Sequence, residues 1–235
     1  MPAARSAAAI ALHAYARYVV PLTLLSVVAF APVIFLALKV PRPANLEQLN
    51  GVLRTPWVLA GVAWIFQLAL VGAAAPLVQS VARGAPLAQT AAPRAALVGL
   101  ARGVFPVGLA AAAVVVGCLA LALPGVALLA LLSLTAAVAA TSPELALPEQ
   151  LATSAALVKK APLGVALVVA AMLALDVGAV VLAKALLVTG AIGKAPTPAQ
   201  LAGGAEVARV AVAAIVLATP PVACILASLH ARRQS

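Results

Sequence analysis

Acidic residues and histidines are scarce in this sequence of 235 residues. The complete set of carboxylate and imidazole side chains is Glu47, Glu144, Glu149, Asp176, Glu206, His13 and His230. They are spread along the chain, and no HExxH, GxSxG or P-loop stretch accompanies them. A metal site would need three or four such ligands close together. The sequence therefore predicts no enzyme, no cofactor and no metal site.

Charged residues of both signs make up only 9% of the chain, against about 25% in a soluble domain. The net charge is +10, but the basic residues occur as ones and twos between apolar runs, which is typical of membrane anchors and topology signals. This distribution excludes nucleic acid as a partner. The two cysteines, Cys118 and Cys224, both lie inside apolar runs, which excludes a disulfide framework and a CxxC metal site.

Hydrophobic residues, in contrast, make up 66% of the chain, and the mean hydropathy is +1.19. No protein interior of this size can receive so many apolar side chains, so bilayer hydrocarbon is the solvent that suits them. The sequence predicts an all-α polytopic membrane protein, with residues 1–235 as one transmembrane domain. Six spans are expected, at 18–38, 56–81, 104–123, 125–141, 162–188 and 207–229. Pro124-Gly125 predicts a tight turn, which makes the third and fourth spans an antiparallel hairpin.

The basic residues between the spans predict the orientation of the chain. Nine of them flank the two termini and the 82–103 and 142–161 loops, whereas five flank the opposite side. Lys and Arg are in excess on the cytoplasmic side of membrane proteins. Both termini are therefore expected in the cytoplasm.

Three segments lead into the hairpins with a common pattern, a basic residue followed by a proline. Arg17 precedes Pro21, Arg102 precedes Pro106, and Lys159-Lys160 precede Pro162. A pattern used several times indicates one repeated structural unit. The unit is expected to be an interfacial helix plus a two-span hairpin, with pseudo-repeats at about 6–81, 91–141 and 147–229. The alternative for the third segment is an ordinary solvated loop.

The basic residues of these segments lie at the depth of lipid phosphate groups and are expected to contact anionic headgroups. They are Arg17, Arg102, Lys159 and Lys160. The alternative is that these charges act only during insertion, as orientation signals. Lys184, His13 and His230 lie near span ends and are expected at the membrane interface.

Asp176 lies near the middle of the fifth span. Placing an aspartate there costs about 2.5–3.5 kcal/mol on the insertion scale, so it is expected to face the bundle interior or a wet cavity. Two interpretations remain open. Asp176 contacts a substrate, an ion or a proton, or it ties helices together through Ser133 or Thr135 of the fourth span.

Two loops on the opposite side carry helix-start signals. Asn45 is followed by Gln48, and Thr197 is followed by Gln200. Both pairs match the capping-box pattern. Each is expected to begin a short surface helix.

The middle of the chain resembles a family of bacterial six-span membrane proteins. The residues that carry the resemblance are "LPGVALLALLSL" from Leu123 and "ELALPEQLATSAALVKKAPLG" from Glu144. The family is that of the YciC-like proteins and the membrane domain attached to some glycerophosphodiester phosphodiesterases. The positions that match its pattern are Pro124-Gly125, Glu144 or Glu149, Ser154 and Lys159-Lys160. The resemblance covers about 90–165. It implies a six-span topology in the bacterial inner membrane, and it carries no enzymatic activity because the phosphodiesterase domain is missing.

These observations favour a non-enzymatic membrane protein, either a subunit of a membrane assembly or a protein that binds or organises lipid. Its expected partners are anionic lipids, with other membrane subunits or self-association as a further option. The alternative is a small transporter or channel with its pathway at Asp176, since repeated hairpins can form a pathway at their pseudo-symmetric interface. An intramembrane enzyme ranks third.

Overall fold

The computed structural model describes residues 6–120, 128–160, 162–188 and 197–232, and every regular element in these ranges is a helix. The all-α prediction is therefore confirmed. The helices are α1 (Ala7–Ala29), α2 (Ala31–Leu38), α3 (Leu46–Val52), α4 (Thr55–Ala82), α5 (Ala92–Ala120), α7 (Thr135–Thr141), α8 (Leu147–Lys160), α9 (Pro162–Leu187) and α10 (Pro198–Ala231).

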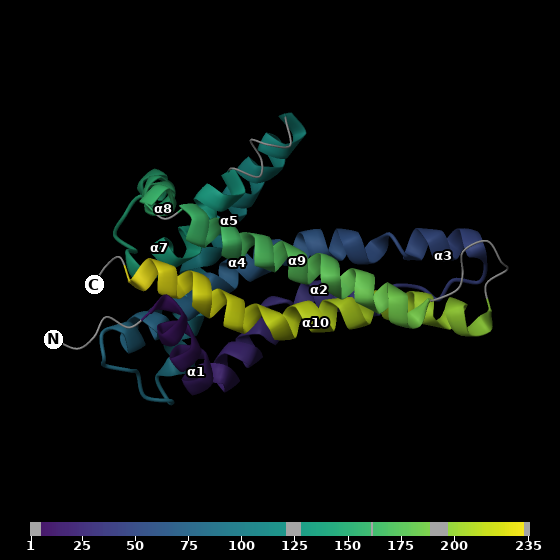
Figure 1. Ribbon diagram of the computed structural model, residues 1–235, viewed down its shortest axis with the longest axis horizontal. Coiled ribbons are helices and arrows are strands. Elements are labelled where there is room, and N and C mark those ends of the chain that lie inside the picture. The colour runs from purple at the N-terminus through teal and green to yellow at the C-terminus, as the bar shows by residue number, and fades with distance from the viewer. Residues whose placement is uncertain (1–5, 121–127, 161, 189–196, 233–235) are drawn as a thin grey trace.

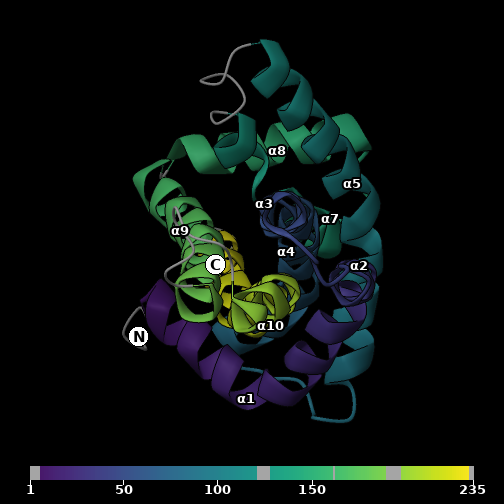
Figure 2. The same ribbon diagram turned by 90° about the vertical axis from the view of Figure 1, so that its right-hand side faces the viewer.

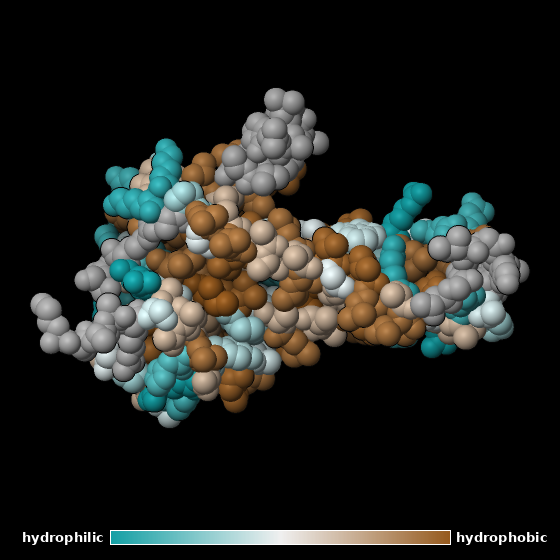
Figure 3. Space-filling view, viewed as in Figure 1, coloured by the Kyte–Doolittle hydropathy of each residue, from teal (hydrophilic) through white to brown (hydrophobic). Residues whose placement is uncertain are grey.

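The molecule is elongated, and the two ends of the chain lie at the same end of it (Figure 1). We call this the termini end, and the end that carries α3 the α3 end. Apolar side chains cover the middle of the face seen in Figure 3, and hydrophilic ones gather at the two ends. Within the described residues, five helical segments are long and apolar enough to cross a bilayer. This distribution is what a membrane protein requires, since a bilayer has a hydrocarbon middle and polar faces.

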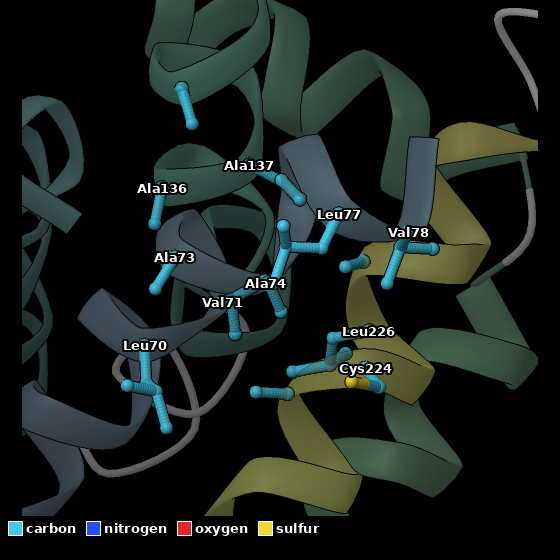
Figure 4. Close-up of a cluster of buried hydrophobic side chains, with 14 of the residues drawn as sticks. Leu70, Val71, Ala73, Ala74, Leu77, Val78, Ala136, Ala137, Cys224 and Leu226 are labelled. Carbon is cyan, nitrogen blue, oxygen red and sulfur yellow. The ribbon is translucent and has the colours of Figure 1, made fainter. Parts of the chain in front are cut away.

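Helices α4 and α10 form the centre of the bundle. In their most apolar windows, 67% and 56% of the residues are buried, against 33% or less in the other candidate spans. Viewed along the long axis, α1, α5, α8 and α9 surround this central pair (Figure 2). Figure 4 shows the packing at the termini end, where Leu77 and Val78 of α4 lie between Ala137 of α7 and Leu226 of α10.

The hydrophobic pattern predicted the bounds of two spans to within one residue. The span expected at 56–81 is α4, and the span expected at 162–188 is α9. The cap signals were also read correctly. The Asn45 side chain accepts a hydrogen bond from the Gln48 N–H and begins the short helix α3. Thr197 forms a complete capping box with Gln200, but this cap begins the long α10 and not a separate short helix.

The six-span count is not confirmed. The fourth span was expected at 125–141, but the described part of it is a helix at 128–132, a turn at Ser133-Leu134 and then α7. This segment is shorter than the ~20 residues that a crossing needs, and it is not among the five candidate spans. The predicted Pro124-Gly125 turn lies outside the described residues.

The three segments expected to be interfacial differ in form. Helix α1 is bent at Tyr18, whose φ of −117° and ψ of 24° are not helical, and Pro21 follows within the same helix. Helix α8 is a helix of its own, whereas α5 runs through Pro106 without a break. All three begin near the termini end (Figure 1). The threefold repeat stays a prediction.

Candidate functional site

Asp176 lies in the bundle interior, as its position in an apolar helix predicted. The residue is 5% exposed and belongs to the buried stripe of α9. Its hydrogen-bond partner is a residue that the sequence pattern did not single out: Gln67 of α4 donates from Nε2 to Asp176 Oδ1 over 2.7 Å. Ser133 donates instead to the carbonyl of Ala130, so it is not the partner. The Thr135 hydroxyl makes no hydrogen bond within the described residues.

Gln67 could have been found by the argument that singled out Asp176. It is a polar side chain near the middle of a span, and it is 2% exposed. A buried amide needs hydrogen-bond partners just as a buried carboxyl does. Two such residues in different spans are therefore candidates for pairing, even when one of them is uncharged.

The Gln67–Asp176 pair belongs to a polar layer of four buried side chains, completed by Ser26 of α1 and Thr219 of α10. The layer separates two hydrophobic clusters. On α4 one cluster covers Leu59 to Ala63 and the other begins at Leu68. The same boundary falls between 22 and 30 on α1 and α2, between 172 and 180 on α9, and between 216 and 223 on α10. Four helices thus place one polar residue each at the same level.

Two oxygen atoms in this layer have no hydrogen-bond donor within the described residues. They are Asp176 Oδ2 and Gln67 Oε1, and both are buried. Neither residue lines any of the four cavities whose lining residues are described. An oxygen without a donor in an apolar interior is unfavourable by about 1–3 kcal/mol. A proton, a water molecule or a cation bound to one of these oxygens would remove the penalty at that atom.

The Ser26 hydroxyl has a different role in the layer. It donates to the carbonyl of Val216 over 2.8 Å. That carbonyl would normally accept from the N–H of residue 220, which is Pro220 and has none. Ser26 therefore satisfies a carbonyl that a proline has freed in a neighbouring helix.

The bend of α1 is stabilised in the same way. Pro21 has no N–H for the carbonyl of Arg17, and the Gln89 side chain donates to that carbonyl from Nε2 over 2.7 Å. The Tyr18 hydroxyl donates in turn to the carbonyl of Leu87 over 3.0 Å. Two hydrogen bonds thus tie the connection between α4 and α5 to the bend.

The residues predicted to contact lipid headgroups lie on three segments around the termini end. Arg17 is on α1, Arg102 on α5, and Lys159 and Lys160 end α8. All four are exposed. The Arg17 guanidinium lies 5.8 Å from the centre of the Tyr18 ring. Their contact with lipid stays a prediction, and the structure adds Arg94, which shares a groove with Arg102.

His230 is buried, contrary to the interfacial position expected from its place near a span end. It is 1% exposed, and its Nε2 lies 2.9 Å from the Thr141 hydroxyl of α7. That hydroxyl donates to the carbonyl of Ala137 over 2.8 Å, which leaves its oxygen free to accept a hydrogen bond from the Nε2–H tautomer of His230. The reason for the burial is that α7 ends beside α10 at the termini end, which hydropathy does not reveal. Lys184 agrees better with expectation, because its Nζ lies 5.4 Å from the centre of the Trp57 ring near the α3 end.

Within the described ranges, no three His, Cys, Asp or Glu side chains are close enough to hold a metal ion. No family model, curated protein or solved structure matches the chain. The class that the fold supports is therefore the broad one, a helical protein with several apolar helices that suit a membrane.

Proposed function

We propose that this protein is a non-enzymatic integral membrane protein that binds and organises anionic lipid at its termini end. The observation that carries the proposal is the exposure of basic residues on three different segments around that end, namely Arg17, Arg102, Lys159 and Lys160. No acidic residue occurs before Glu47 or between Glu47 and Glu144. The arginines of α1 and α5 thus have no carboxylate on their own or neighbouring segments of sequence. Each such charge contributes about 1 kcal/mol near an anionic surface.

Native mass spectrometry after mild detergent extraction tests this proposal. The variant replaces Arg17, Arg102, Lys159 and Lys160 with Gln, and a control replaces the exposed Lys39, Arg42 and Arg54 near the α3 end. The first variant is expected to retain less phosphatidylglycerol and cardiolipin than the wild type, whereas the control retains nearly as much. Equal retention in a correctly inserted first variant would contradict the proposal. The masses also report self-association and any co-purified subunit.

We further propose that the termini end faces the cytoplasm of a bacterium and that the membrane is the inner one. The excess of Lys and Arg near the termini supports this orientation, and the resemblance of 90–165 to the YciC-like family, itself still a proposal, supports the membrane. In a background without Cys118 and Cys224, single cysteines replace the exposed Asn50 and Glu144. An impermeant maleimide is expected to label position 50 in intact cells and position 144 only after permeabilisation. The reverse pattern would invert the topology.

A second candidate function is transport of a proton or small cation through the polar layer. The observation that favours it is the pair of buried oxygens without donors, Asp176 Oδ2 and Gln67 Oε1. The test is proton flux into proteoliposomes under an imposed potential, followed with a trapped pH dye, with sodium flux measured in parallel. Flux that Asp176→Asn abolishes and Glu206→Gln leaves intact would support transport. Absence of flux in the wild type would exclude the candidate.

A further inference from the structure

Arg94 of α5 lies on the ridge between two grooves. One groove, of about 470 Å³, separates α1 from α5, and its lining includes Val20, Leu24 and Val28 of α1 and Pro93, Arg94 and Leu97 of α5. The other, of about 320 Å³, lies against α4 and α7 and contains both Arg94 and Arg102. At 100° per residue, Pro93 and Leu97 point to one side of α5 and Arg102 to the other, with Arg94 between them. Arg94 therefore lines both grooves.

The groove between α1 and α5 has an apolar floor and a polar mouth. Val20, Leu24 and Val28 follow one another along α1 over about 12 Å, and Leu97 faces them from α5. Gln89 and Arg94 are the polar residues of its lining. An acyl chain with an anionic headgroup has the same division into an apolar length and a charged end.

Within the described residues, neither Arg94 at this mouth nor Arg102 in the second groove forms a salt bridge. Arg94 is exposed, as is Arg102, with which it shares the second groove. No acidic residue is present in α1, α4, α5 or α7. Glu149 of α8, which also packs against α5, accepts a hydrogen bond from the Ala146 N–H instead. Two arginines two helical turns apart can hold one phosphate between them, because guanidinium groups bind phosphate oxygens with paired N–H donors. Positive charge without internal compensation at a membrane surface is complementary to an anionic lipid.

The mouth is also fixed in shape before any ligand arrives. Gln89 is held by its bond to the carbonyl of Arg17, and Leu87 by the Tyr18 hydroxyl. These two bonds set the distance between the bend of α1 and the start of α5. A preformed groove loses less conformational freedom on binding than a mobile one.

We propose that this groove binds one acyl chain of an anionic glycerophospholipid, whose phosphate is held by Arg94 together with Arg102. The inference rests on the proposed lipid-binding function and deepens it, since it assigns a discrete site and adds Arg94 to the basic residues already named. The ligand is a membrane lipid and not free phosphate, because the groove contributes an apolar contact that inorganic phosphate cannot use.

Fluorescence quenching by brominated lipid tests the site. Trp57 and Trp64 are replaced by Phe, and a single Trp is introduced at Leu24 in the groove or, in a second probe, at Leu97. The control probe is at Leu173, which is exposed on α9 and lies just before Asp176 in the polar layer, as Leu24 lies just before Ser26. The two positions therefore share a similar depth. Each protein is reconstituted into phosphatidylcholine vesicles with a minor fraction of acyl-brominated phosphatidylglycerol, or of brominated phosphatidylcholine.

Brominated phosphatidylglycerol is expected to quench the groove probes more than the control probe, whereas brominated phosphatidylcholine quenches all probes alike. Arg94→Gln is expected to weaken the preference for phosphatidylglycerol about fivefold, and Arg94→Lys to keep most of it. Equal quenching by the two lipids at the groove would overturn the inference, as would a preference that Arg94→Gln leaves unchanged. If these tests fail but the Gln variant of Arg17, Arg102, Lys159 and Lys160 still loses anionic lipid, only the groove site is wrong. If neither experiment shows selectivity, the proposed function is wrong as well.

Discussion

Gly72→Ala is expected to destabilise the protein, because Gly72 lies where α4, α5 and α7 approach most closely. A Cβ at this position would lie 2.8 Å from the Gly99 carbonyl oxygen, 3.2 Å from the Ala136 carbonyl oxygen and 3.3 Å from the Ala136 Cβ. The first distance is about 0.6 Å below 3.4 Å, the lower limit of ordinary van der Waals contact. Movement of α5 alone would not relieve the contacts with α7. Such overpacking typically costs about 1–3 kcal/mol.

Gly61→Ala is the matched control, since it lies on the same helix and a Cβ there would meet nothing within 4 Å. Both substitutions gain the same helix propensity, about 1 kcal/mol in an exposed helix. The difference between the two variants therefore isolates the strain. The free energy of unfolding is measured by SDS titration in lipid–detergent bicelles, with helicity followed by circular dichroism. If Gly72→Ala is as stable as Gly61→Ala within about 0.5 kcal/mol, the helices do not pack as closely at Gly72 as the structure indicates.

Two further predictions concern the polar layer, and both use the same unfolding assay. A double-mutant cycle with Gln67→Ala and Asp176→Ala is expected to give a coupling of about 1 kcal/mol, because interhelical hydrogen bonds in membranes average about 0.6 and reach about 1.7 kcal/mol. Zero coupling would mean that the two side chains do not meet. Ser26→Ala is expected to cost about 1 kcal/mol but almost nothing when Pro220→Ala is also present, since the new N–H can bond to the Val216 carbonyl. An equal cost in both backgrounds would refute this account of the bond.

Hydropathy was sufficient to locate α4 and α9, because each is an apolar run long enough to cross a bilayer. The caps at Asn45 and Thr197 could also be predicted from the sequence, since a cap depends on residues three apart in sequence. The length of the helix that a cap begins depends on more distant residues. Thr197 caps α10, which continues from Pro198 to Ala231. The Gly203-Gly204 pair is a turn signal in the sequence, but both glycines lie inside this helix, where they allow close contact with Leu187 and Leu49.

The fourth predicted span is the one that the structure does not confirm. Residues 128–141 are apolar apart from Ser133, Thr135 and Thr141, so they were taken with 125–127 as a crossing. The structure divides them at Ser133-Leu134 and packs α7 against α4 and α5. An apolar stretch can be buried by protein as well as by lipid, and hydropathy does not distinguish the two. Ser154 of α8 donates to the Leu131 carbonyl over 2.9 Å, which joins α8 to the helix at 128–132 that precedes α7.

The candidate sites could be predicted only in part. The cost of burying a carboxyl placed Asp176 in the interior, but its pairing with Gln67 depends on the register of α9 against α4. Arg94 was recognised only as one charge among those that orient the chain. Its position between two grooves results from the way α5 crosses α1 and α4, which no local pattern encodes.

Pro21 of α1 and Pro220 of α10 each leave a backbone carbonyl without its usual helical donor. A proline inside a helix frees the carbonyl four residues earlier, and in or near a membrane a donor from within the protein satisfies that carbonyl where water is scarce. The Arg17 carbonyl receives one from Gln89, and the Val216 carbonyl receives one from Ser26. The first of these donors also lines the mouth of the groove between α1 and α5. The hydrogen bond that permits the bend of α1 therefore also shapes the proposed lipid site, so the bend and the site form one structural unit.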